Sequence, residues 1–151
     1  MRLYEFLTDE TILPALQVET KEAAIAEVAE TLRGHASVRD FDEFLGAVFA
    51  REMDSTTGVG HGVAIPHART DSVDDFVAAV GRVPDGVDFQ AVDGQNVRLI
   101  ILMGIPTRKV KSYLKLLAHL SLLIKQGDFT EAVAEAPDPA AVRSVFEAFE
   151  Q

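Results

Sequence analysis

One segment constrains this chain more than any other. Residues 51–67, REMDSTTGVGHGVAIPH, lead from the end of an expected helix through three spaced glycines to a proline and a histidine. Glycines at alternate positions allow positive φ angles, which let successive N–H groups approach an anion. Pro66 fixes its own φ and biases Ile65 to an extended shape, so the backbone before His67 is stiff. We interpret the segment as a device that holds His67 rigidly beside hydrogen-bond donors.

The donors in this segment suit a phosphoryl group. Arg51 offers a planar guanidinium, Thr56 and Thr57 offer hydroxyls, and Gly58 and Gly60 offer backbone N–H groups. A histidine that accepts a phosphoryl group needs one free ring nitrogen, a hydrogen bond that fixes the tautomer, and donors for the charge of the transferring group. On these residues alone, a glycine-rich turn followed by an ordinary histidine is the alternative.

Several better-known motifs do not fit. The dinucleotide fingerprint needs a glycine where Val63 stands and a strand before the loop, and the phosphate loop of nucleotide triphosphatases needs a lysine. His61 and His67 have no carboxylate between them and do not match zinc spacing. Ser55 lacks the strand–turn–helix setting of a nucleophile elbow. We therefore expect no metal site.

Composition narrows the class of protein. The 151 residues suit one domain over 1–151, and 48% hydrophobic content is typical of a globular chain. There is no cysteine, which excludes disulfides and thiolate chemistry. The net charge of −10 disfavours nucleic acid as a partner. No apolar run is long enough to span a bilayer, and the first residues do not resemble a signal peptide, so we expect a cytoplasmic protein without direct membrane insertion.

The periodicity of apolar residues predicts an α/β fold. Helical spacing and caps predict helices, continuous branched runs predict buried strands, and Pro-Asp-Gly and Asp-Gly predict turns. The order of elements favours a three-layer α/β/α sandwich with a single mixed sheet. The chain is expected to begin with a helical turn at 4–7 and an extended piece at 12–16. The expected helices lie near 20–33, 41–52, 114–126 and 129–136 and from 139 onward. The expected strands lie at 62–65, 76–83 and 97–103, and the expected turns at 84–86 and 93–94.

The glycine segment resembles the active-site motif of a known family. Arg51-Glu52, the run from Thr56 to Gly60, and the run from Gly62 to His67 are similar to the motif of enzyme IIA domains of the fructose/mannitol type, in the bacterial phosphoenolpyruvate-dependent phosphotransferase system (PTS). The resemblance spans nearly the whole chain and is strongest to the nitrogen-regulatory and fructose members. It implies an α/β/α fold and no metal or nucleotide cofactor.

The resemblance also implies a reaction. His67 would take a phosphoryl group from the phosphohistidine of an HPr-like phosphocarrier protein, with Arg51, Thr56, Thr57 and the N–H groups of Gly58 and Gly60 supporting it. The group would pass to an enzyme IIB domain or, in the regulatory branch, its presence would act as a signal to a target protein.

One position departs from the family. Where members often have a second histidine close to the first, this chain has Tyr113, followed by Leu114. Tyrosine donates a hydrogen bond but does not carry a proton near neutral pH as histidine does. Lys109 and Lys111 lie near the start of an expected helix, where cations oppose the dipole, and this favours an anion or an acidic partner nearby. His61, in the glycine segment, is a further candidate for the partner surface.

We therefore expect a phosphoryl carrier with a regulatory output, because the chain is a single domain without an attached IIB or membrane unit and carries Tyr113. The first alternative is a sugar-specific component that passes phosphate to a IIB domain for fructose- or mannitol-type uptake. The second is an interaction module of the same fold that is not phosphorylated.

Overall fold

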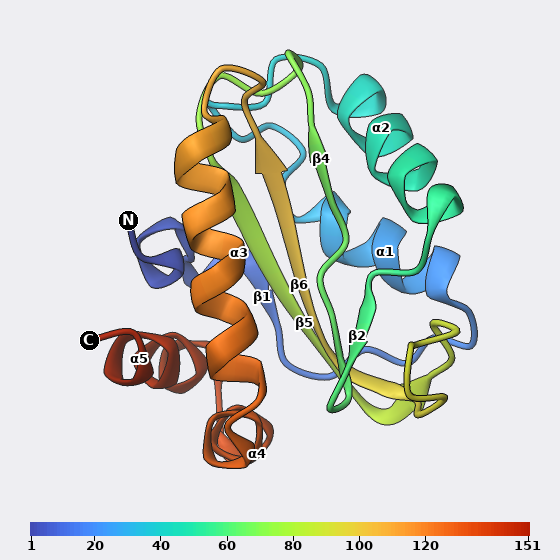
Figure 1. Ribbon diagram of the computed structural model, residues 1–151, viewed down its shortest axis with the longest axis vertical. Coiled ribbons are helices and arrows are strands. Elements are labelled where there is room, and N and C mark those ends of the chain that lie inside the picture. Colours follow the sequence, from blue (N-terminus) through green and yellow to red (C-terminus); the bar gives the residue numbers. More distant parts are fainter.

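The computed structural model describes residues 1–151, and one mixed sheet lies between two layers of helices (Figure 1). The predicted three-layer α/β/α sandwich is confirmed. The helices are α1 (Lys21–Glu30), α2 (Phe41–Asp54), α3 (Val110–Ile124), α4 (Gly127–Glu135) and α5 (Pro139–Phe149), and the short 3-10 helices are η1 (Leu3–Phe6) and η2 (Asp9–Thr11). The strands are β1 (Ile12–Leu13), β2 (Gly58–Gly60), β3 (Val63–Ala64), β4 (His67–Arg69), β5 (Val77–Val87) and β6 (Val97–Ile105).

The sheet is organised around β6. Its strand order is β1-β5-β6-β3-β2, and β4 also pairs with β6, beyond the end of β3. β5 runs antiparallel to β6, whereas β3 and β4 run parallel to it, in the registers Val63↔Leu99 and His67↔Met103. β3 and β4 thus lie end to end along one edge of β6, interrupted by Ile65 and Pro66.

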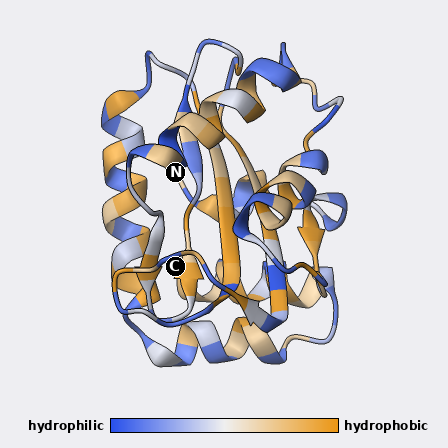
Figure 2. Cartoon of the chain, turned by 90° about the vertical axis from the view of Figure 1, so that its right-hand side faces the viewer, coloured by the Kyte–Doolittle hydropathy of each residue, from blue (hydrophilic) through white to orange (hydrophobic).

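Two apolar cores cover the two faces of the sheet. Alternate residues of β6 point in opposite directions: Ile101 and Met103 pack toward α3, α4 and α5, and Ile100 and Leu102 pack toward α1 and α2. All four side chains are 0–1% exposed, as expected for a central strand covered on both faces. In Figure 2 the middle strands are mostly orange, while the helices carry both orange and blue residues.

Side-chain caps begin three of the helices. Thr20, Asp40 and Asp138 precede α1, α2 and α5, and each side-chain oxygen accepts a hydrogen bond from the amide three residues later, at 3.1, 3.0 and 2.8 Å. These caps satisfy amides that lack an intrahelical partner. Pro139 follows Asp138 at the first position of α5, where its missing N–H costs nothing.

Several boundaries differ from the prediction. Residues 84–86 were predicted to form a turn, but they continue β5, where a register shift against β6 between Arg82 and Val87 accommodates the extra residues. Pro84 fits because β1 pairs with β5 only at Val80 and Gly81, so no partner on that side needs its N–H. α2 continues to Asp54, and Gly127 begins α4 rather than only ending α3.

The chain ends are joined by one buried carboxylate. Glu150, fully buried just after α5, accepts hydrogen bonds from the backbone N–H groups of Leu3 at 2.6 Å and Tyr4 at 3.0 Å. The imidazole Nε2 of His119, on α3, lies 3.8 Å from the same carboxylate. This contact holds the N-terminal turn against α3 and α5. None of the helices combines the length and the apolar character needed to cross a membrane.

Candidate functional site

His67 opens β4, on the outer edge of β6 and between α2 and α3 (Figure 1). The backbone on its N-terminal side is fixed by the sheet, because the carbonyl of Pro66 accepts a hydrogen bond from Met103 N at 3.0 Å. Proline has no N–H to donate, so the strand pairing breaks at this residue and β4 resumes at the histidine. The side chain is 5% exposed, and the backbone and its neighbours set its direction.

The two ring nitrogens of His67 have different partners. Nδ1 lies 2.7 Å from the carbonyl oxygen of Ile65, and Nε2 lies 3.1 Å from the hydroxyl of Tyr113. A carbonyl oxygen only accepts, so Nδ1 carries the proton. In the neutral imidazole Nε2 then holds the free lone pair, and Tyr113 donates to it. The arrangement fixes one tautomer, which is what a histidine nucleophile requires.

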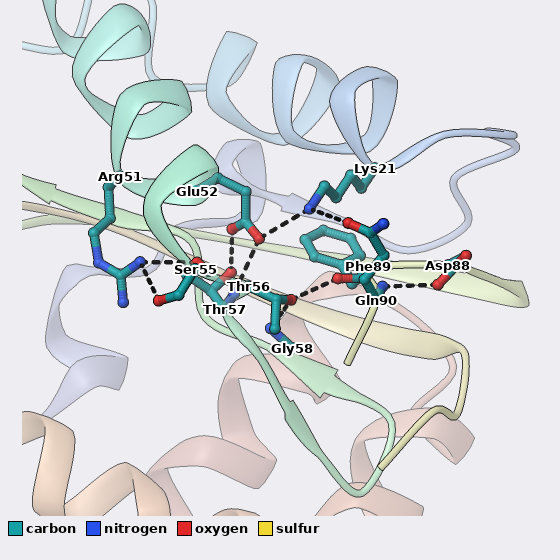
Figure 3. A network of polar contacts seen from close by, with 10 residues as sticks. All are labelled: Lys21, Arg51, Glu52, Ser55, Thr56, Thr57, Gly58, Asp88, Phe89 and Gln90. Carbon is teal, nitrogen blue, oxygen red and sulfur yellow. Dashed lines mark hydrogen bonds and ion pairs between the residues drawn. The ribbon is translucent and has the colours of Figure 1, made fainter. Parts of the chain in front are cut away.

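A cleft of about 580 Å³ opens beside this histidine. Arg51, from the last turns of α2, and Arg69, from β4, both line it, and Tyr113 and Leu114 line it from α3. The only hydrogen bonds that Arg51 makes within the protein run from Nη1 to Ser55, which leaves its other nitrogens for a ligand (Figure 3). Two cations beside an imidazole lone pair suit a phosphoryl group.

The surroundings keep His67 neutral. Burial is the main cause that lowers the pKa of its imidazole below the ordinary value for histidine, and the charges of Arg51 and Arg69 act in the same direction. The hydrogen bond to Ile65 and the carboxylate of Glu52 oppose this shift. The net direction leaves the lone pair of Nε2 available at neutral pH.

Glu52 is the buried centre of a polar network that holds the glycine segment (Figure 3). Its carboxylate accepts hydrogen bonds from the backbone N–H of Thr57, at 3.0 Å, and from the hydroxyl of the same threonine. It also forms an ion pair of 3.4 Å with Lys21, which in turn donates to Gln90 at 3.4 Å. The side chain of Glu52 is only 4% exposed, so these partners are what make its charge tolerable.

The network continues to His67 through the backbone. Thr57 O accepts a hydrogen bond from Ile65 N at 3.0 Å, and Ile65 O accepts one from His67 Nδ1. Four consecutive residue contacts therefore connect Lys21 of α1 and Glu52 of α2 to the imidazole. Thr57 thus contributes to the position of the ring.

The glycine segment forms a β-hairpin that leads to His67. β2 and β3 pair antiparallel through a turn at His61 and Gly62, which have φ angles of 58° and 75°. Gly60, also with positive φ, precedes this turn. Gly58 packs so closely on Ala91 that an added Cβ would lie 2.8 Å from it. The glycines thus serve the hairpin and its packing.

In the structure, the threonines and Gly58, which were also predicted to support phosphate, form hydrogen bonds within the protein. The Thr56 hydroxyl donates to Phe89 O and accepts from Gly58 N, and the Thr57 hydroxyl donates to Glu52 (Figure 3). Of the five predicted supports, only Arg51 lines the cleft beside His67. A direct contact of the threonines or of Gly58 and Gly60 with a phosphoryl group stays a prediction.

The three residues predicted for a partner surface do not line this cleft. His61 is exposed and lines a second hollow with Arg82 and Arg98. Lys109 forms an ion pair of 2.7 Å with Asp75, and Lys111 lines a third hollow beside it. The unfavourable cation at the start of α3 is thus partly neutralised by Asp75 within the protein.

Two residues near His67 were given no role from the sequence. Arg69 follows His67 by two positions on β4, and residues at this spacing share one side of a strand, a signal that would have placed it at the site. Glu52 lies near the C-terminal end of α2, where an acid opposes the helix dipole. This unfavourable placement indicated that nearby hydrogen-bond donors stabilise the carboxylate of Glu52.

Comparisons with known proteins agree with this geometry. The sequence profile of the family "Phosphoenolpyruvate-dependent sugar phosphotransferase system, EIIA 2" matches residues 5–149. The chain is 33% identical over 142 residues to the fructose-specific EIIABC component of Bacillus subtilis, of which it spans 22% of the length. It is 32% identical over 148 residues to a nitrogen regulatory protein of Bradyrhizobium diazoefficiens, covering 96% of this chain and 94% of the relative.

Solved structures show the same fold. The crystal structure of nitrogen regulatory protein IIA-Ntr from Neisseria meningitidis superposes with a TM-score of 0.88 at 29% identity, covering 95% of this chain and 97% of that one. Enzyme IIA mannitol of Escherichia coli, solved in complex with phosphorylated enzyme IIB mannitol, has a TM-score of 0.80 at 22% identity, covering 94% of this chain and 97% of that one. At that identity the second likeness concerns the fold alone.

We expect His67 to titrate below about pH 6.5, the value of an unperturbed histidine, because burial and two arginines disfavour its cation. Since the folded pKa is the lower one, its contribution to stability is complete above the unfolded pKa and is lost as pH falls through the folded value. Ring resonances followed by NMR measure this midpoint. A midpoint at or above 6.5 would contradict the description of the site.

Thr57→Val keeps the shape of the side chain but removes the hydroxyl that donates to buried Glu52. We expect the free energy of unfolding to fall by about 1–3 kcal/mol, measured by urea denaturation. Thr130→Val is the control, because its hydroxyl bonds Gly127 O at the surface. The network would lose its proposed importance if both variants were equally stable.

Proposed function

Because the chain belongs to the EIIA 2 family of the phosphoenolpyruvate-dependent sugar phosphotransferase system, we propose that it carries a phosphoryl group on Nε2 of His67. The donor is the phosphohistidine of an HPr-like phosphocarrier protein. The observation that carries the proposal is the Nδ1 contact with Ile65 O at 2.7 Å, which directs the lone pair to the nitrogen on the cleft side.

The phosphoryl transfer needs no proton-transfer step. The lone pair of Nε2 forms a bond to phosphorus, while the N–P bond of the donor breaks and its electron pair returns to the donor imidazole. Nδ1 of His67 keeps its proton, and the hydrogen bond to Ile65 O stabilises the positive charge that the ring gains. Arg51 and Arg69 face the oxygens of the group as it moves between the two nitrogens.

We infer that the phosphorylated protein acts mainly as a regulatory signal. Support comes from the similarity to nitrogen regulatory proteins, which extends over 94% and 97% of the lengths of two such chains. In this reading a target protein distinguishes the phosphorylated from the unphosphorylated cleft. Leu114, 56% exposed at the cleft, supplies apolar surface next to the charged group.

Transport is the second candidate, since the chain is 33% identical to a fructose-specific protein. The acceptor would then be an enzyme IIB domain, the partner with which the mannitol IIA protein of this fold was solved. Incubating the phosphorylated protein with purified fructose-type IIB domains separates the two readings. Rapid loss of the phosphoryl group to one of them favours transport, and its retention favours regulation.

We expect one added phosphoryl group when the protein is incubated with phosphoenolpyruvate, enzyme I and an HPr-like carrier, because these generate the phosphohistidine donor. Intact-mass spectrometry detects the product, which is acid-labile. His67→Ala removes the acceptor, whereas His35→Ala removes a histidine of the turn between α1 and α2 and is the matched control. Phosphorylation of His67→Ala, or none of the wild type, would overturn the proposal.

Arg69→Gln is expected to slow phosphoryl transfer about tenfold, because it removes one of two cations at the cleft while solvent screens the exposed charge. Arg98→Gln is the control, since Arg98 is an exposed arginine that lines another hollow. Single-turnover labelling from phosphorylated carrier gives the rates. Equal rates for the two variants would remove Arg69 from the site.

A further inference from the structure

We propose that the hydroxyl of Tyr113 is a gate on His67. In the resting protein it occupies the lone pair of Nε2, a docked partner displaces it, and it then donates to an oxygen of the phosphoryl group. This inference rests on the proposed function and adds a mechanism by which a partner controls the site.

The gate follows from the direction of one hydrogen bond. Nδ1 of His67 already donates to Ile65 O, so the 3.1 Å contact at Nε2 has Tyr113 as the donor. The hydroxyl therefore lies along the lone pair that must attack phosphorus. An N–P bond is much shorter than 3.1 Å, so phosphorus and the hydroxyl oxygen compete for one direction from the ring. Phosphorylation requires Tyr113 to move.

Protonation of His67 does not open this gate. The charged groups that act on His67 are Arg51 and Glu52 from α2 and Arg69 from β4, and Asp54 also lines the cleft. Protonation of His67 itself would convert Nε2 into a donor and abolish the nucleophile. Movement of Tyr113 is the remaining way to free the lone pair.

The position of Tyr113 allows such movement. It lies in the first turn of α3, whose preceding residue, Lys109, makes no capping hydrogen bond and whose first turn has no acid. Its hydroxyl has no hydrogen-bond partner besides His67. The ring is partly exposed at the cleft, where a docking protein would contact it together with Leu114.

The displaced hydroxyl has a second use once the group is bound. A hydrogen bond from a neutral hydroxyl to a charged phosphoryl oxygen is stronger than one to a neutral imidazole. The guanidinium of Arg69, with Cζ 5.9 Å from the centre of the tyrosine ring, lies close enough to interact with the ring in the resting position. A phosphohistidine stabilised by this hydrogen bond would hydrolyse more slowly, and a long lifetime is useful for a regulatory signal.

The first test uses the unphosphorylated protein. Tyr113→Phe removes the donor that stabilises neutral imidazole, so the pKa of His67, followed by NMR, is expected to rise relative to wild type. Tyr4→Phe is the matched control, because Tyr4 lies on η1 and its hydroxyl has no hydrogen-bond partner. An unchanged pKa in Tyr113→Phe, or an equal rise in the control, would overturn the gate.

The second test uses phosphoramidate, a small phosphoryl donor that does not dock. Tyr113→Phe is expected to be labelled on His67 roughly 3- to 10-fold faster than wild type, since one hydrogen bond of about 1 kcal/mol no longer blocks Nε2. Its phosphohistidine is expected to hydrolyse faster. With phosphorylated carrier protein as donor the rate advantage should shrink, because docking opens the gate.

Equal or slower labelling of Tyr113→Phe by phosphoramidate would contradict the gate. If no variant is labelled by any donor, the proposed carrier function fails, and the pKa comparison alone decides whether Tyr113 occupies the lone pair. Tyr113→Leu, which also lacks the hydroxyl, repeats both measurements if the phenylalanine variant melts at a much lower temperature.

Discussion

The hydrogen bond from His67 Nδ1 to the carbonyl of Ile65 is the contact on which the site depends. It decides which nitrogen carries the proton, and therefore which one is the nucleophile and which faces Tyr113. The bond spans two residues, so its geometry is set by the backbone from Ile65 to His67. Pro66 stiffens that backbone, and its carbonyl is tied to β6 through Met103. The chemistry of one imidazole is thus fixed by strand pairing.

The carbonyl of Ile65 is itself positioned through contacts with helix α2. Glu52, buried with a charge, holds Thr57, and Thr57 pairs with Ile65 through the backbone. Burying a carboxylate is costly, and Lys21 and the threonine donors offset that cost. The same helix presents Arg51 at the cleft, so α2 contributes both a ligand-facing cation and the anchor of the loop. Within this motif Arg51 lines the cleft, whereas Glu52 and Thr57 support the backbone.

Much of the fold was predictable because local signals agreed with the tertiary structure. The caps at Thr20, Asp40 and Asp138 indicate the starts of helices, and the run of branched residues in β6 indicates a buried strand. His67 was singled out by the segment that precedes it. β4 was missed because three residues are too few for a period, and the glycine hairpin because its pairing with β3 and its packing on Ala91 are tertiary. Tyr113 was found as a departure from the family, but its direct bond to Nε2 required coordinates.

We propose that the protein directs phosphorylation to Nε2 by keeping the proton on Nδ1. A long-range 1H–15N correlation spectrum of the phosphorylated protein, with coupling to phosphorus, identifies the modified nitrogen. We expect phosphorus to be bonded to Nε2 of His67 while Nδ1 retains its hydrogen bond to Ile65 O. Phosphorus on Nδ1 would mean that this hydrogen bond breaks during the reaction, and the proposed role of Ile65 would then be wrong.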